Sequence, residues 1–197
     1  ANARYERFYR TVRGQHVRTI LNIPILVKTA EQAVTLLDQQ YEHQAPTVVA
    51  FANAHTLNST ASHHGLQTAL DRAIVFNDGI GVDFASRLLF GKKFPENLNG
   101  TDFIPHYLQS SRYRHRVFLL GGRPGVAAKA AQRLARLSPQ HDFVGTSHGY
   151  YQQRDLPRVL AQIRHSGADI LLVAMGNPRQ EAWLNEHLEQ TGCHLGF

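Results

Sequence analysis

Residues 116–126 read RVFLLGGRPGV, and this stretch decides the fold class. Its first part, Arg116–Leu120, is a short apolar run of the kind that forms a buried strand. The turn GGRPG follows, and residues 126–137 then have the length and composition of a helix. A strand that passes through a glycine turn directly into a helix is the repeating unit of layered α/β folds.

The same order of strand and helix recurs on both sides of this stretch. Strands are predicted at 17–27, 47–52, 73–76, 116–120, 142–146, 169–174 and from 194 onward. Helices are predicted at 29–43, in the polar stretch up to 70, from 81 to 90, and at 101–110, 126–137, 155–166 and 178–191. Short strands joined by helices pair in parallel, so we expect a Rossmann-like layered α/β fold with a mainly parallel sheet over residues 17–197.

Length and composition exclude several classes of protein. The 197 residues are 43% hydrophobic and 18% charged, which suits one globular domain and excludes a disordered chain or a coiled coil. The single cysteine, Cys193, excludes an intrachain disulfide and a cysteine-based zinc site. No apolar run has the length of a membrane span, and no secretory signal begins the chain. We therefore expect a cytoplasmic protein, peripheral to a membrane at most.

The positive charge is concentrated at the start of the chain. Residues 1–20 hold five arginines and one glutamate, which leaves only +2 of the net +6 for the other 177 residues. Residues 1–16 are therefore predicted to form a basic arm that contacts either an anionic membrane surface or a neighbouring subunit of a homo-oligomer. The nearly neutral remainder, which lacks any nucleic-acid-binding signature, argues against a nucleic acid partner.

Glycine, amide and carboxylate residues gather where the predicted strands end. Because ligands of parallel sheets bind at the carboxyl ends of the strands, this edge is the predicted site. The candidate residues there are Asn53, Asn77, Asp78, Gly79, Gly81, Gly121, Gly122, Arg123, Gly149, Tyr150, Gly176, Asn177, Gln180 and Glu181. No spacing typical of a metal site accompanies them, so no metal and no cofactor are expected.

Each junction has a structural alternative beside the functional one. Gly121 and Gly122 can admit a phosphate to the following helix N-terminus, helped by Arg123, or they form a plain tight turn. Asp78 is either a general base or the N-cap of the next helix. Asn177 and Pro178 fit the N-cap and the first position of the last helix, which leaves only Gln180 without a structural explanation.

Taken in order, the junctions resemble one family. The motifs are Ala52-Asn53-Ala54-His55, Asn77-Asp78-Gly79-Ile80-Gly81, Asn99-Gly100-Thr101-Asp102, Phe118-Leu119-Leu120-Gly121-Gly122, His148-Gly149-Tyr150 and Gly176-Asn177-Pro178-Arg179-Gln180-Glu181. Their order and spacing over residues 18–197 are similar to the WecG/TagA/CpsF family of bacterial glycosyltransferases.

The resemblance implies an activity and a location. Members of this family move a sugar from a UDP-sugar onto an undecaprenyl-diphosphate-linked sugar at the cytoplasmic face of the inner membrane, with inversion and without an essential metal. It also implies that Asp78 is the catalytic base and that Asn53 and Gln180 bind substrate.

Two positions depart from the family's common pattern. Phe51 stands where the family often has threonine, and Asn97 stands where it often has arginine, so these two roles are not carried over. The segment Pro95–Phe103 is similar to the exopolysaccharide (GumM-like) branch, which implies UDP-glucose as donor. Family members also continue beyond the strand at 194 with a basic tail implicated in membrane docking and in closing the active site. We therefore expect a chain trimmed at its C-terminal end.

The sequence thus predicts hexosyl transfer from a UDP-sugar, with UDP-glucose as donor, in exopolysaccharide repeat-unit synthesis. The alternatives are transfer of N-acetylmannosamine or N-acetylmannosaminuronic acid onto a lipid-linked GlcNAc, or a module that binds nucleotide without catalysis.

Overall fold

A computed structural model describes residues 14–197, so nearly all of the arm predicted for residues 1–16 lies outside the described part of the chain. The described residues form a six-stranded sheet in the order β4-β3-β8-β7-β5-β6, and every neighbouring pair runs parallel. The predicted Rossmann-like α/β fold is thereby confirmed. The strands are β3 (Thr47–Ala52), β4 (Ala73–Asn77), β5 (Arg116–Gly121), β6 (Asp142–Ser147), β7 (Ile170–Ala174) and β8 (Leu195–Gly196).

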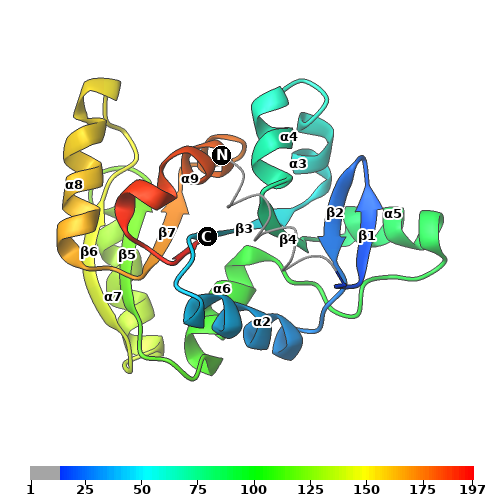
Figure 1. Ribbon diagram of the computed structural model, residues 1–197, viewed down its shortest axis with the longest axis horizontal. Coiled ribbons are helices and arrows are strands. Elements are labelled where there is room, and N and C mark those ends of the chain that lie inside the picture. The colour runs from blue at the N-terminus through cyan, green and yellow to red at the C-terminus, as the bar shows by residue number, and fades with distance from the viewer. Residues whose placement is uncertain (1–13) are drawn as a thin grey trace.

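Helices cover both faces of this sheet (Figure 1). In β5, Val117 and Leu119 face one hydrophobic cluster, while Phe118 and Leu120 face another, as the alternation of a strand requires. The first face is covered by α2 (Ala30–Glu42), α6 (Gly100–Ser110) and α7 (Val126–Leu137). The opposite face is covered by α3 (Ala54–Ser59), α4 (His64–Leu70), α8 (Leu156–Ser166), which follows the short helix η1 (Gln153–Asp155), and α9 (Arg179–Thr191).

The segment predicted as one strand at 17–27 is instead a hairpin. Its strands β1 (Val17–Ile20) and β2 (Ile23–Leu26) pair antiparallel, apart from the main sheet. Leu21 and Asn22 form the turn with φ of +47° and +65°. Two consecutive left-handed residues are what a type I′ hairpin turn demands, and a leucine at the first of them hides that signal in the sequence.

The hairpin packs against α5 (Ile80–Phe90) at one end of the molecule, opposite α7 and α8 in Figure 1. The buried Arg18 of β1 holds the two together, because its guanidinium donates to Ser86 Oγ at 2.7 Å and to the carbonyl of Lys92 at 2.9 Å. The same group lies 5.1 Å from the centre of the Phe94 ring. A charged hydrogen bond and a ring contact therefore fix α5 against the hairpin.

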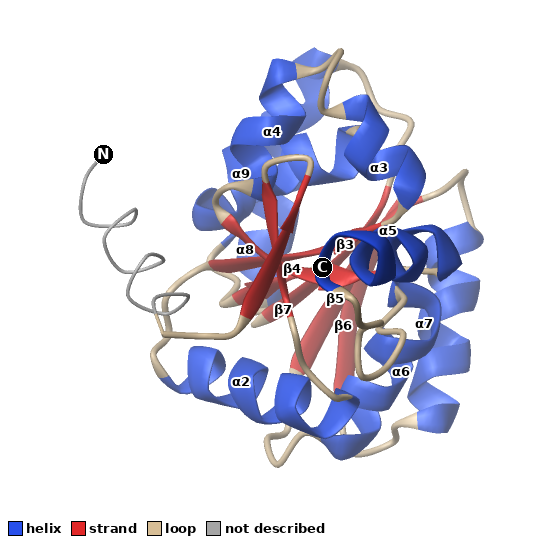
Figure 2. Cartoon of the chain, turned by 90° about the vertical axis from the view of Figure 1, so that its right-hand side faces the viewer, coloured by secondary structure: helices blue, strands red, loops and turns tan. Residues whose placement is uncertain are grey.

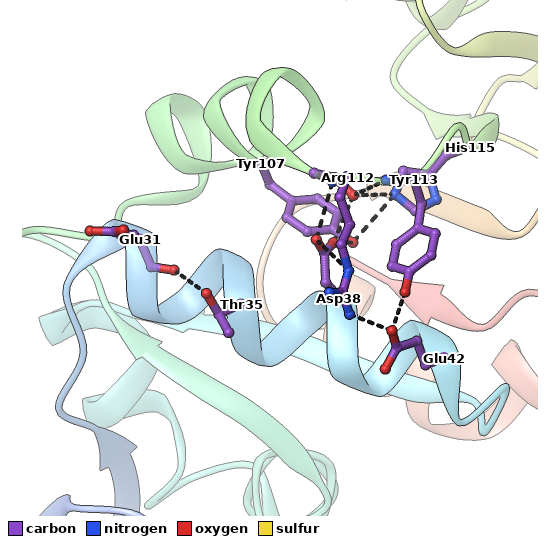
Figure 3. A network of polar contacts seen from close by, with 9 residues as sticks. Glu31, Thr35, Asp38, Glu42, Tyr107, Arg112, Tyr113 and His115 are labelled. Carbon is purple, nitrogen blue, oxygen red and sulfur yellow. Dashed lines mark hydrogen bonds and ion pairs between the residues drawn. The ribbon is translucent and has the colours of Figure 1, made fainter.

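A buried polar network joins α2 to the segment between α6 and β5 (Figure 3). Its centre is Asp38, which is 5% exposed. One carboxylate oxygen accepts from Tyr107 Oη at 3.2 Å and from Ser111 Oγ at 2.6 Å, and the other accepts from the backbone N–H of Arg112 at 3.2 Å. Burial and the nearby Asp38 charge raise the pKa of Tyr107, so this hydroxyl stays protonated and keeps donating.

Replacement of Asp38 by alanine should lower the free energy of unfolding by about 2–4 kcal/mol, because the buried Tyr107 hydroxyl and two part-buried donors lose their acceptor at once. Urea unfolding followed by circular dichroism measures this loss. The matched control is Glu42→Ala on the same helix, which removes exposed contacts to Arg112 and Tyr113 and should change stability little. Equal effects of the two variants would contradict a central role for Asp38.

Candidate functional site

The candidate base sits at the junction of two neighbouring strands. Asp78 directly follows β4, and Asn53 directly follows β3, its partner in the sheet. The Asn53 amide Nδ2 donates to Asp78 Oδ2 at 3.4 Å, and the backbone N–H of Asp78 donates to the carbonyl of Ala52 at 2.9 Å. The Asp78 side chain is half-buried, so it is oriented by the protein and still reachable from solvent. It is not the N-cap of α5, because Gly79 occupies that position.

A threonine that the sequence did not single out connects Asn53 to a third strand end. Asn53 Oδ1 accepts from the backbone N–H of Thr56 at 2.9 Å and from its hydroxyl at 3.0 Å. The Thr56 hydroxyl in turn accepts from Asn177 Nδ2 at 3.2 Å. Thr56 is buried, and its three contacts tie the ends of β3 and β7 together. Only its place three residues after a capping asparagine could have indicated it.

The predicted capping role of Asn177 is wrong. The helix α9 begins at Arg179 with Pro178 at the capping position, and Asn177 lies one residue before it. The asparagine side chain is directed to Thr56 instead of to the helix N–H groups. The Asn177 amide therefore lies at the candidate site, and capping does not account for it.

Three glycines let the ends of β5, β6 and β7 approach one another. The N–H of Gly122 donates to the carbonyl of Ala174 at 3.0 Å, and the N–H of Gly149 donates to the carbonyl of Gly122 at 2.9 Å. A Cβ on Gly121 would lie 2.2 Å from the Ala174 oxygen, and one on Gly149 would lie 3.2 Å from the Gly121 Cα. Backbone packing therefore requires Gly121, whatever ligand binds nearby.

Two of the three remaining candidate glycines border open space. Gly79 and Gly176 have φ of +88° and +81°, and a Cβ built on either would meet no atom within 4 Å. Gly81, by contrast, packs α5 against α3, since its Cβ would lie 3.0 Å from the Ala54 Cβ. The two open glycines leave the backbone beside Asp78 and beside Asn177 accessible to a ligand.

Three exposed polar side chains, those of Arg123, Tyr150 and Arg179, lie near the glycine turns. Arg123 and Tyr150 are exposed, and neither side chain has a hydrogen-bond or ion-pair partner within residues 14–197. Arg179 donates to the carbonyl of Gly149 at 3.1 Å.

Asn77 is fully buried and donates to the carbonyl of Glu96 at 2.9 Å, so it positions the loop that follows α5. In that loop, Asn97 Oδ1 accepts from the N–H of Gly79 at 2.8 Å.

Gln180 and Glu181 support the loop that precedes α9. Gln180 Oε1 accepts from the N–H of Gly176 at 3.2 Å, and its amide donates to Glu181 Oε1 at 3.3 Å. Glu181 is 4% exposed, and burial raises the pKa of its carboxyl. Glu181 therefore lies behind the site rather than on its surface.

Three buried polar atoms at this edge of the sheet have no hydrogen-bond partner within the described residues, namely Asn77 Oδ1, His148 Nδ1 and Asn177 Oδ1. A fourth, Glu181 Oε2, lies behind the site, and three others, on His115, Ser138 and His194, lie away from this edge. Buried polar atoms are nearly always hydrogen-bonded, so a polar ligand could pair with the three at the site. Among residues 14–197, no group of three or more His, Cys, Asp or Glu is arranged to hold a metal ion.

Comparison with known proteins identifies one family. The sequence model of the Glycosyl transferase WecG/TagA/CpsF family matches residues 18–197. The chain belongs to the WecG/TagA/CpsF glycosyltransferase family. An N-acetylglucosaminyldiphosphoundecaprenol N-acetyl-beta-D-mannosaminyltransferase of Bacillus subtilis (strain 168) is 26% identical over 184 residues, covering 91% of this chain and 71% of the relative. The enzyme of the same name from Bacillus spizizenii is 32% identical over 114 residues, covering 57% of this chain and 43% of the relative.

The comparisons confirm the predicted family, and they support one of the predicted sets of substrates better than the other. Both WecG/TagA/CpsF relatives are named as N-acetylmannosaminyltransferases, which matches the alternative given above rather than UDP-glucose and exopolysaccharide synthesis. The site residues, including the base Asp78, stay predictions. No helix in residues 14–197 combines the length and the apolar character needed to cross a membrane.

Replacing Thr56 with valine should lower kcat/KM roughly 10- to 100-fold, because Asn53 and Asn177 lose the hydroxyl that connects them. Thr56→Ser keeps the hydroxyl and should keep most of the activity. A second control is Thr60→Val, which removes a buried hydroxyl whose one hydrogen bond among residues 14–197 is to the carbonyl of Leu57. Initial rates per folded molecule are the measurement, and equal losses in the Thr56→Val and Thr60→Val variants would show that Thr56 is merely structural.

The raised pKa of Glu181 should make stability depend on pH in a defined direction. The folded protein keeps this proton at pH values where the unfolded chain has released it, so the contribution is complete at low pH and is lost as pH rises through the folded pKa. Glu181→Gln cannot titrate, and should therefore gain stability relative to the wild type between pH 4 and pH 8. Urea unfolding across this range tests the prediction. Glu31→Gln, at an exposed glutamate of α2 without an ion pair among the described residues, should run parallel to the wild type, whereas a parallel Glu181→Gln profile would refute the raised pKa of Glu181.

Proposed function

We propose that the chain transfers an N-acetylmannosaminyl group from a UDP-sugar to a GlcNAc linked to undecaprenyl diphosphate, with inversion and without a metal ion. The observation that carries the proposal is the Asn53–Asp78 pair at the ends of two neighbouring parallel strands. Membership of a glycosyltransferase family and the names of the two relatives support the reaction class and the substrates.

In the proposed reaction Asp78 is the general base. One of its oxygens accepts from Asn53, which orients the carboxylate and leaves the other oxygen to accept the proton of the acceptor hydroxyl. That hydroxyl oxygen forms a bond to the anomeric carbon while the bond from this carbon to the UDP oxygen breaks. One displacement inverts the anomeric centre and needs one carboxylate as base, unlike the paired carboxylates of a glycoside hydrolase.

The departing UDP carries the developing negative charge, which needs stabilisation. In the proposal, the exposed Arg123 and Arg179 supply cations, and the turn at Gly121 and Gly122 brings the start of α7 to the diphosphate. Oriented N–H groups and guanidinium groups then take the part that a metal ion plays in other transferases. Gly176 and Gly149 lie at the same edge of the sheet.

The lipid-linked acceptor gives the proposal a location. Because undecaprenyl diphosphate is anchored in a bilayer, the enzyme would work as a peripheral protein at the cytoplasmic face of the bacterial inner membrane.

The proposal is tested by assaying the protein, in its full natural length, with UDP-ManNAc, UDP-GlcNAc and UDP-glucose in the presence of EDTA. The acceptor is a short-chain lipid diphosphate that carries GlcNAc, and the readouts are UDP release, product mass and the anomeric configuration. Transfer of N-acetylmannosamine with inversion is expected. Transfer of glucose would overturn the donor, activity that EDTA abolishes would overturn metal independence, and UDP binding without transfer would indicate a non-catalytic module.

Asp78→Asn should lower kcat roughly 10²- to 10⁴-fold, because the amide cannot accept the proton. Steady-state rates with the donor identified above measure the effect. Asp71→Asn is the matched control, since Asp71 precedes β4 and so lies at the opposite edge of the sheet. An Asp78→Asn enzyme that keeps more than a tenth of the wild-type rate would exclude Asp78 as the base.

A further inference from the structure

The helix α5 exposes most of its large apolar side chains. Ile80, Phe84 and Leu88 are 87%, 67% and 75% exposed, and their spacing of four residues puts them on one side of the helix. Leu89 and Phe90 extend this surface at 60% and 43%. Of the nine large hydrophobic residues that are exposed in residues 14–197, these five belong to one helix of 11 residues. We call these five residues the α5 apolar face.

The α5 apolar face is a property of a well-anchored helix. The opposite side of α5 buries Val82 and Ser86, and Ser86 accepts the hydrogen bond from Arg18. Gly81 packs against Ala54 of α3. Figure 2, which views the molecule from this end, shows α5 in the foreground. Since an exposed apolar patch of this kind marks an interaction surface, something must cover the α5 apolar face when the protein works.

Three exposed cations border the α5 apolar face. Arg87 on the helix and Lys92 and Lys93 just after it are exposed. The one acidic residue of the helix, Asp83, is occupied within the fold, because its Oδ1 accepts from the backbone N–H of Phe94 at 3.3 Å. Apolar side chains bordered by cations are typical of a helix that lies in the surface of an anionic bilayer.

The position of α5 relates this surface to the site. Its N-cap, Gly79, directly follows Asp78, so the candidate base lies one residue from the start of the helix. A bilayer in contact with α5 would therefore hold the site beside the membrane, where the lipid-linked acceptor presents its sugar.

We propose that the α5 apolar face inserts into the surface of an anionic bilayer, with Arg87, Lys92 and Lys93 at the level of the lipid headgroups. The functional meaning of this contact rests on the proposed lipid-linked acceptor, but the contact itself is independently measurable. It adds to the proposed location by naming the surface that binds and the lipid charge that it requires.

The test is co-sedimentation of the full natural protein with vesicles of phosphatidylcholine, with and without phosphatidylglycerol. Wild-type protein should bind the anionic vesicles and should bind phosphatidylcholine vesicles weakly. The Phe84→Ser/Leu88→Ser variant should bind anionic vesicles at least about tenfold more weakly, because two inserted side chains are lost. Lys92→Gln/Lys93→Gln should weaken binding at low salt and reduce its salt dependence. Leu137→Ser, at a leucine of α7 that is 48% exposed, is the matched control and should bind like the wild type.

Two further measurements make the outcome decisive. Thermal unfolding checks that the α5 variants fold, as expected for substitutions at exposed positions. Their transfer to the short-chain acceptor should match the wild type, while transfer to an acceptor embedded in anionic vesicles should fall. Unchanged vesicle binding by the Phe84→Ser/Leu88→Ser variant would overturn the proposal. The proposal would also be overturned if the wild-type protein forms a dimer and binds no vesicles, and the variant is a monomer. In that case α5 would be an interface between copies of the chain. If the Phe84→Ser/Leu88→Ser variant loses vesicle binding but the wild-type protein transfers no sugar, the α5 apolar face would still be the membrane-binding surface. The proposed function would then be overturned.

Discussion

All six strands of the main sheet run in one direction, and the rest of the molecule depends on that constraint. Parallel strands bring their carboxyl ends to a single edge, so every strand-to-helix junction opens on the same side. Residues that are 25 and 121 positions apart in the chain thereby come within hydrogen-bonding distance, as Asn53 does with Asp78 and Thr56 does with Asn177. The helices on both faces exclude water from the sheet and leave this edge as the place where polar side chains can meet a ligand.

The fold class could be predicted from the sequence because it depends on local patterns, and the candidate site was proposed from the same patterns. Apolar runs of strand length, glycine turns and helix caps can each be recognised in a short stretch of sequence. The parallel direction of the strands follows from the helices that connect them. The hairpin was missed for an equally local reason, since Leu21 occupies a left-handed turn position where asparagine or glycine would have been recognised. The resemblance to a glycosyltransferase family added the activity, which no local pattern specifies.

The contacts inside the site could not be predicted, because they join segments that the sequence keeps apart. Thr56 looks like an ordinary helix residue until Asn177 is seen to reach its hydroxyl, and Asn97 marks only a departure from the family pattern until the N–H of Gly79 is placed beside it. Glu181 shows the opposite error. Its motif suggested a ligand contact, and burial behind the loop gives it a supporting position. The α5 apolar face was invisible for the same reason, since an apolar helix is expected to be buried until its exposure is measured.

The crowding at Gly121 has a consequence for how this site is studied. Because the Ala174 carbonyl occupies the space that any Cβ would need, all other residues are excluded there by the packing of β5 against β7. Evolution would preserve such a glycine in a protein that never bound a nucleotide. Its invariance among relatives would therefore carry no information about phosphate recognition, and an inactive mutant at this position would report a distorted sheet edge. Arg123, whose side chain is exposed and outside this packing, is the residue in this turn whose variation would test the proposed contact with a diphosphate.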